Sequence, residues 1–142
     1  MNYEIKRPET YQIAEALKLA MIVFTEFEMP DYEDEAFANF TLGMGSENMF
    51  VAVDEESVIG MINERGGGHV SMLFVDKKYH RKGIATALLN AIIDDLKSRG
   101  IFAVTLNSSP YGIPFYEKFG FKATSEMQHK DGFLYLPMEY IM

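Results

Sequence analysis

Apolar and polar positions alternate with different periods along this chain, and the early pattern predicts helices. Residues 3–7 have the alternation of a short strand. Pro8 then stands where prolines favour the first turn of a helix, and apolar side chains follow it at helical spacing. They are Ile13, Ala16, Leu17, Ala20, Met21 and Phe24. Pro30 interrupts the spacing, and residues 31–42 predict a second helix.

The period then becomes that of strands. Residues 49–53 and 57–63 predict a hairpin across the acidic turn between them, and residues 69–75 predict a third strand after three glycines. Residues 84–97 form the clearest helix, because their apolar side chains make a single stripe. The mainly apolar residues 101–106 predict a strand that is buried on both faces of a sheet.

A short helix at residues 114–119, closed by Gly120, and two final strands at 121–126 and 133–141 complete the pattern. The predicted order is β-α-α-β-β-β-α-β-α-β-β. We therefore expect one α/β domain over residues 1–142, in which helices flank a mixed, mostly antiparallel sheet.

Composition narrows the possible chemistry. Of the 142 residues, 48% are hydrophobic and 24% are charged, the balance of a soluble globular protein. The absence of cysteine excludes disulfides, thiolate metal sites and a covalent acyl-cysteine intermediate. His69, His80 and His129 lack the spacing of metal ligands, so we expect no metal. The sequence shows no secretory leader and no membrane-spanning run, and we expect a cytoplasmic protein without a membrane partner.

The net charge of −8 argues against a nucleic-acid partner, because such a chain repels phosphate backbones. One segment departs from this balance. Four of the 13 Lys and Arg residues fall within six positions, at Lys77, Lys78, Arg81 and Lys82. An ordinary solvated cluster of charges is the alternative to a specific role.

This basic segment connects a predicted strand to the start of the clearest helix. The free N–H groups of a first helical turn carry partial positive charge and bind phosphate when side chains do not block the approach. Gly83 and Ala85 are small at this place, so the segment predicts a diphosphate site. The Gly-Lys-Ser/Thr ending of a P-loop is absent, and only Gly83 fits a dinucleotide fingerprint. A plain strand-to-helix turn remains the alternative.

Two motifs resemble those of the GNAT N-acetyltransferases. His80-Arg81-Lys82-Gly83-Ile84-Ala85, preceded by Leu73-Phe74-Val75-Asp76, resembles the acetyl-CoA loop Gln/Arg-x-x-Gly-x-Gly/Ala. Pro114-Phe115-Tyr116-Glu117-Lys118-Phe119-Gly120-Phe121 resembles the Phe-Tyr-Glu-Lys-x-Gly-Phe signature of the same family. His80 departs from the usual Gln or Arg. Its imidazole can donate to phosphate, but its charge varies near neutral pH, so CoA affinity is expected to weaken as the pH rises.

The resemblance implies that acetyl-CoA is the co-substrate. Its pantetheine arm would enter between diverging parallel strands at 69–75 and 101–107, with an N–H near Phe74 polarising the acetyl carbonyl. The implied contacts are Leu73, Phe74, Val75, His80, Arg81, Lys82, Gly83, Ile84, Ala85 and Thr86, together with Asn107 or Ser109. Ser109 stands where many members have Asn, and Asn107 lies two positions earlier, so both remain open.

Tyr116 matches the family's general acid, which protonates the departing CoA thiolate. A thiol has a pKa near ~8.5 and a phenol near ~10, so this proton transfer is not steeply uphill. The alternative is one more aromatic side chain on a short core helix. The acceptor amine must also lose a proton, and holding an alkylamine neutral at pH 7 costs roughly 4.6 kcal/mol. The candidate bases are Glu28, Glu64, His69 and Glu126.

The identity of the acceptor stays open between small-molecule and protein amines. An acidic cluster suits a cationic acceptor, although a solvated helix start is the alternative. It comprises Glu26, Glu28, Asp31, Glu33, Asp34 and Glu35. Interleaved aromatic side chains also leave room for an apolar acceptor. Two rival functions are a GNAT-fold module that binds acyl-CoA without turnover and a protein for another phosphate ligand. The long apolar final strand could support a homodimer.

Overall fold

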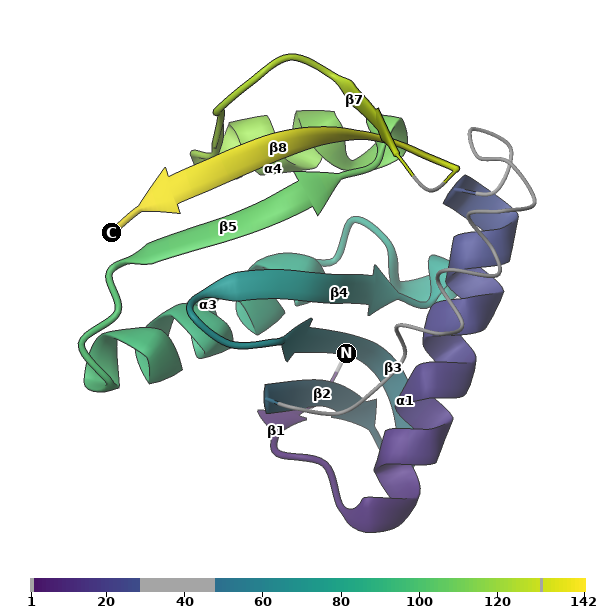
Figure 1. Ribbon diagram of the computed structural model, residues 1–142. Helices are drawn as coiled ribbons and strands as arrows, with labels where there is room; N and C mark the ends of the chain where they lie inside the picture. The colour runs from purple at the N-terminus through teal and green to yellow at the C-terminus, as the bar shows by residue number, and fades with distance from the viewer. Residues whose placement is uncertain (1, 29–47, 131) are drawn as a thin grey trace.

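The computed structural model describes residues 2–28, 48–130 and 132–142. A single sheet has helices on both faces (Figure 1). Its strands are β1 (Glu4–Lys6), β2 (Asn48–Asp54), β3 (Ser57–Glu64), β4 (His69–Val75), β5 (Ala103–Ser108), β6 (Lys122–Ala123), β7 (Gln128–Lys130) and β8 (Phe133–Ile141). The helices are α1 (Thr10–Val23), α3 (Ile84–Ser98) and α4 (Ile113–Phe119), with short turns η1 (Phe24–Glu28), η3 (Lys77–Tyr79) and η4 (Pro110–Gly112).

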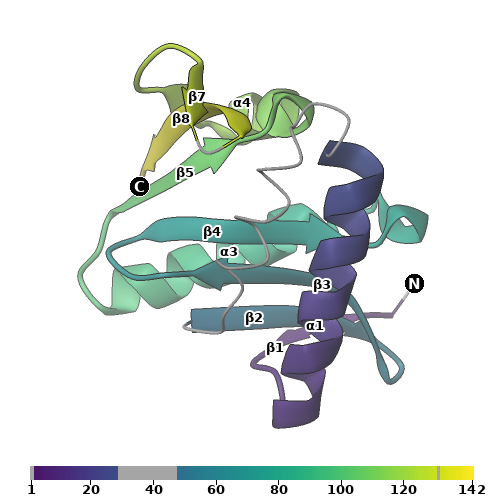
Figure 2. The same cartoon turned by 45° about the vertical axis from the view of Figure 1, so that its right-hand side comes forward.

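The strand order is β1-β2-β3-β4-β5-β8-β6, and β7 also pairs with β8. Every pair is antiparallel except β4 with β5, which confirms the mixed, mostly antiparallel sheet. Helix α1 crosses one face of β3 and β4, whereas α3 covers the other face of β2, β3 and β4 (Figure 2). The second predicted helix, at residues 31–42, lies outside the described residues.

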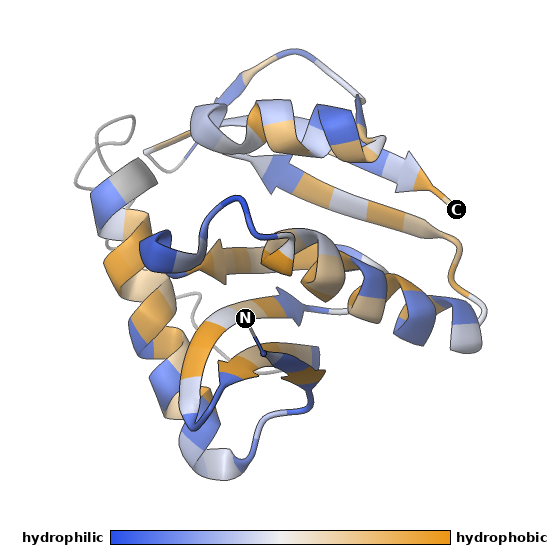
Figure 3. Cartoon of the chain, turned by 180° about the vertical axis from the view of Figure 1, so that it is seen from behind, coloured by the Kyte–Doolittle hydropathy of each residue, from blue (hydrophilic) through white to orange (hydrophobic). Residues whose placement is uncertain are grey.

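The apolar stripe predicted for α3 is confirmed. All six of its side chains are buried in the core cluster between α3 and the sheet: Ile84, Leu88, Leu89, Ile92, Ile93 and Leu96. Viewed from this side, the loop that leads from β4 into α3 is strongly hydrophilic, whereas the strands beneath α3 are largely hydrophobic (Figure 3). The helix therefore packs on the sheet while its preceding loop faces solvent.

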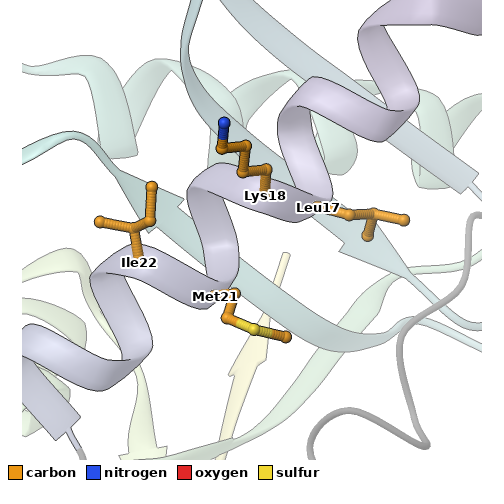
Figure 4. A pocket seen from close by; sticks show the side chains of 4 residues that line it. All are labelled: Leu17, Lys18, Met21 and Ile22. Carbon is orange, nitrogen blue, oxygen red and sulfur yellow. The ribbon is translucent and has the colours of Figure 1, made fainter.

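Helix α1 buries a face rotated from the predicted one. Leu19 and Val23 are buried, whereas Leu17 and Met21 are only partly buried. The latter two line a shallow depression on the outer side of α1, together with Lys18 and Ile22 (Figure 4). Gln12 turns inward because its side chain accepts a hydrogen bond from the Glu9 N–H at 2.8 Å, which fixes the start of the helix.

Two predicted strands need correction. Residues 101–106 are not buried on both faces: β5 begins at Ala103, the Phe102 side chain is 57% exposed, and burial alternates along the strand. Residues 121–126 do not form one strand, because β6 covers only Lys122–Ala123 and β7 begins at Gln128. Every residue from 122 to 130 is exposed, so no buried face fixes a continuous register there.

The turns on either side of β3 follow the sequence. Asp54 pairs with Ser57 across the predicted hairpin. The glycine run ends at Gly68, which has a φ of 87° and lies so close to β5 that a Cβ atom would stand 2.5 Å from the Ala103 carbonyl oxygen. Only glycine fits there. Among the described helices, none combines the length and the apolar character needed to cross a bilayer.

Candidate functional site

Among the strands that the structure describes, β4 and β5 are the only parallel neighbours, and their pairing ends after two residues. His69 pairs with Thr105 and Val70 with Leu106. Beyond these two pairs, β4 continues to Val75 and β5 to Ser108 without pairing with each other. Figures 1 and 2 show the two strands diverging toward their carboxyl ends. Within the described part of the chain, no strand pairs with this side of β4 beyond Val70. The divergence that the resemblance implied is therefore present.

The carboxyl end of β4 leads directly into the basic loop. Three contacts fix its path. The Asp76 carboxylate accepts a hydrogen bond from the Lys78 N–H at 2.9 Å, and the Asp76 N–H donates to the Ile59 carbonyl oxygen at 2.8 Å. The Tyr79 hydroxyl donates to the Asp54 carboxylate at 3.0 Å, and this hydrogen bond raises the pKa of Tyr79. The loop is thereby tied to both strands of the β2–β3 hairpin, close to its turn.

The first turn of α3 is open to an approaching ligand. Arg81 has a φ of 63° and Gly83 a φ of 81°, so the chain curls tightly before Ile84 begins the helix. A Cβ atom built on Gly83 would meet no other atom within 4 Å. The side chains of Lys82 and Arg81 are exposed around it. First-turn amides, an open backbone and nearby positive charge make a site that fits a diphosphate.

His80 is turned back toward the sheet. Its Nε2 lies 2.7 Å from the Val75 carbonyl oxygen, at the end of β4. The imidazole therefore braces the loop against the strand. The contact of His80 with the co-substrate stays a prediction. The fall in the affinity of the protein for CoA with rising pH also stays a prediction.

Tyr116 lies on α4, which follows β5 on the other side of the divergence. Its ring is half-buried and packs edge-on against Phe115 and Phe121, with ring centroids 5.3 Å and 5.4 Å away. The structure thus holds the phenol in an aromatic cluster, and its role as the acid stays a prediction. Asn107 is exposed at the end of β5, whereas Ser109 is buried and its Oγ accepts a hydrogen bond from the Gly112 N–H at 3.2 Å.

His69 stands at the point where β4 and β5 begin to part. Its Nδ1 lies 2.9 Å from the Thr105 Oγ1. Burial lowers the pKa of His69, the charge of Arg65 lowers it further, and the charge of Glu64 opposes this. The ring is therefore largely neutral near pH 7 and has a lone pair able to accept a proton.

Glu64 lies at the end of β3 and is buried. Its side chain is 1% exposed, and its carboxylate accepts hydrogen bonds from Asn48 Nδ2 at 2.7 Å, the Gly68 N–H at 3.0 Å and Arg99 at 3.2 Å. Burial alone would raise the pKa of Glu64, but these hydrogen bonds and the Arg99 charge outweigh it and lower the pKa. A carboxylate so occupied is a poor proton acceptor.

The remaining acidic candidates lie apart. Glu126 is exposed between β6 and β7. The side chain of Glu28, and all of residues 31–35, lie outside what the structure describes. Glu26 forms an ion pair with Lys77 at 3.1 Å, a contact that sequence patterns do not signal. This pair joins the turn after α1 to the basic loop.

Over residues 2–28, 48–130 and 132–142, no three His, Cys, Asp or Glu side chains gather as metal ligands.

This fold recurs in solved acetyltransferases. A GCN5-related N-acetyltransferase from Rhodopseudomonas palustris is similar with a TM-score of 0.82 at 17% identity, over 100% of this chain and 97% of that one. The PaiA N-acetyltransferase of Thermoplasma acidophilum, solved in complex with coenzyme A, gives a TM-score of 0.77 at 18% identity over 100% of both chains. The diverging strands beside a basic helix start thus belong to the acetyltransferase fold of the GNAT class.

The family is shown by sequence as well. The family model for the acetyltransferase (GNAT) domain matches residues 11–142, and the chain belongs to this family. The glucosamine 6-phosphate N-acetyltransferase of Trypanosoma brucei brucei is 37% identical over 70 aligned positions, and the match covers 47% of this chain and 48% of that protein. The chain spans about half the length of the first curated relatives it matches.

Proposed function

We propose that this chain transfers the acetyl group of acetyl-CoA to a primary amine by direct attack. The observation that carries the proposal is the end of the β4–β5 ladder at Val70 and Leu106, beside the open, basic first turn of α3. One ligand with a thin arm and a phosphate-rich end suits both features. Membership of an acetyltransferase family supports the same reaction.

In this proposal the nucleotide end of acetyl-CoA lies on the first turn of α3 and the pantetheine arm lies against β4. The residues assigned to it are Leu73, Phe74, Val75, His80, Arg81, Lys82, Gly83, Ile84, Ala85 and Thr86, with Asn107 preferred to the buried Ser109 as a contact from β5. A main-chain N–H of the Phe74 region polarises the acetyl carbonyl.

The chemistry needs two proton transfers. The amine nitrogen attacks the carbonyl carbon, the carbon–sulfur bond breaks, and Tyr116 donates a proton to the leaving thiolate. We assign the amine's proton to His69 through a chain of water molecules, because its lowered pKa keeps the ring neutral at the pH of the reaction and five residue steps of β4, roughly 15 Å of strand, separate it from Phe74. The acceptor is a small-molecule or protein amine.

Thermal unfolding with acetyl-CoA, ATP or NAD at equal concentration tests the co-substrate. Ligand at 100 times its dissociation constant stabilises a fold by about 2.7 kcal/mol, which raises the melting temperature by several degrees for a chain of this size. We expect the rise with acetyl-CoA alone. The double replacement Arg81→Ala and Lys82→Ala should reduce it, whereas Lys122→Ala, at an exposed lysine of β6, should leave it intact. A rise with ATP or NAD but none with acetyl-CoA would reject the proposal.

Replacing His69 by Gln tests the base. Glutamine keeps a polar group beside Thr105 but accepts no proton, so kcat/KM at pH 7 is expected to fall about 10²-fold. In the unchanged protein, kcat/KM should fall as acid protonates His69 below its ordinary pKa of about 6.5, and this acidic limb should vanish in the variant. Glu126→Gln is the matched control. An acidic limb that survives the replacement would assign the base to another group.

The alternative function is an acyl-CoA-binding module without turnover, used as a sensor or interaction partner. A panel of amino sugars, polyamines and peptides with free N-termini separates the two. Acetyl-CoA binding without acetylation of any member would favour the module.

A further inference from the structure

A buried amide side chain lies in the strand next to the divergence. Asn63, on β3, is 1% exposed, although β3 otherwise presents mainly apolar side chains to the two cores. Burying an amide is costly unless it is hydrogen-bonded. Its Nδ2 donates to the Ser71 Oγ at 3.0 Å, and that hydroxyl donates to the Asn63 carbonyl oxygen at 3.3 Å. Each of the two residues therefore donates one hydrogen bond to the other.

Ser71 is the extra residue of a β-bulge. Glu64 pairs with Val70 and Asn63 pairs with Met72, so β4 has one residue more than β3 between these pairs. The packing shows the consequence. Val70 lies in the core beneath α3, whereas Met72 and Phe74 lie in the core beneath α1, although an unbroken strand would place all three on one face. The bulge thus turns the strand over at Ser71.

The bulge coincides with the divergence. The last pair between β4 and β5 is Val70 with Leu106, and Ser71 is the next residue of β4. A bulge bends its strand and increases the local twist. The bend therefore falls where β4 leaves β5, two residues before the segment Leu73 to Val75 that we assign to the pantetheine arm.

We propose that Asn63 and Ser71 are positioning residues for the co-substrate: their mutual hydrogen bonds pin the bulge that opens β4 from β5. The proposal rests on the proposed function for its ligand. Without these hydrogen bonds the bulge at Ser71 is held less firmly, so the path of residues 71–75 varies more; this weakens the contacts of β4 with the pantetheine arm and leaves the basic loop unchanged.

Two ligands separate these regions. Coenzyme A would occupy both the gap between β4 and β5 and the basic loop before α3. Adenosine 3′,5′-bisphosphate, its nucleotide portion, lacks the pantetheine arm and would occupy the loop alone. Ser71 is exposed, so Ser71→Ala removes one hydroxyl without opening a cavity. In Ser71→Ala, we expect calorimetry to show a Kd for CoA raised about fivefold, which is the effect of one lost hydrogen bond. The Kd for adenosine 3′,5′-bisphosphate should stay unchanged. Ser71→Thr, which keeps the hydroxyl, should bind CoA as the unchanged protein does.

Asn63→Ala supplies a second variant, with a larger expected loss of CoA affinity. Equal weakening of both ligands, or CoA affinity unaffected by Ser71→Ala, would overturn the proposal. If the unchanged protein bound no CoA, the proposed function would fail instead, and amide hydrogen exchange would still decide the role of the pin. Exchange at residues 71–75 should quicken in Ser71→Ala and return to normal in Ser71→Thr. Equal exchange in all three proteins would reject it.

Discussion

Phenylalanine in place of Tyr116 is expected to lower kcat for acetyl transfer about 10²-fold while leaving the Kd for acetyl-CoA nearly unchanged. The substitution removes only the hydroxyl. The ring contacts with Phe115 and Phe121, at 5.3 Å and 5.4 Å, are available to phenylalanine as well, so α4 keeps its packing. The loss then falls on the step in which the leaving thiolate takes a proton.

Steady-state kinetics and calorimetry together check this expectation. Tyr140→Phe is the matched control, because Tyr140 packs in the same aromatic cluster, with its ring centroid 5.2 Å from that of Phe119. The control should retain turnover. Unchanged turnover in Tyr116→Phe would remove Tyr116 from the reaction. A parallel loss of affinity would make it a binding residue.

The elements that the sequence predicted best are those with a strong local period. The stripe of α3 and the β2–β3 hairpin are confirmed because each buries one face and takes its register from neighbours close in the chain. The two motifs identified the family for a similar reason: the loop before α3, and α4 with the turn that follows it, are each one continuous segment. A motif contained in one continuous segment can be recognised from the sequence of that segment alone.

The features that escaped prediction depend on distant partners. Glu64 has the sequence context of a loop residue, but Arg99, 35 positions away, reaches its carboxylate. The bulge at Ser71 is decided by Asn63 on another strand, and its pattern of alternation looks regular in the sequence. The apolar run at residues 101–106 predicted burial on both faces, yet its exposed Phe102 precedes the strand. Hydrophobicity alone does not tell which face a neighbour covers.

Alanine at position 64 is expected to lower the free energy of unfolding by about 2 to 3 kcal/mol at pH 7. The change leaves the Gly68 N–H and the Asn48 amide without the carboxylate that accepts from them. Arg99 is 45% exposed, so water takes up its charge and the loss stays below that of a fully buried ion pair. Urea unfolding measures the difference, and Glu126→Ala, at an exposed carboxylate, is the control.

Lowering the pH should remove this difference in the free energy of unfolding between the unchanged protein and Glu64→Ala. Because folding lowers the pKa of Glu64, its contribution is fully present above the unfolded pKa of about 4.3 and disappears as the pH falls through the folded value. Asp95, which pairs with Arg99 at 3.0 Å and also has a lowered pKa, loses its contribution in the same acidic range. The unchanged protein should therefore destabilise steeply below about pH 4, while Glu64→Ala shows a shallower fall and the two curves converge. Curves that stayed parallel to pH 2 would mean that the Glu64 carboxylate adds nothing as an anion. Since Gly68 also accepts from the Thr105 N–H at 2.9 Å, loss of this anion would loosen the junction from which β4 and β5 part.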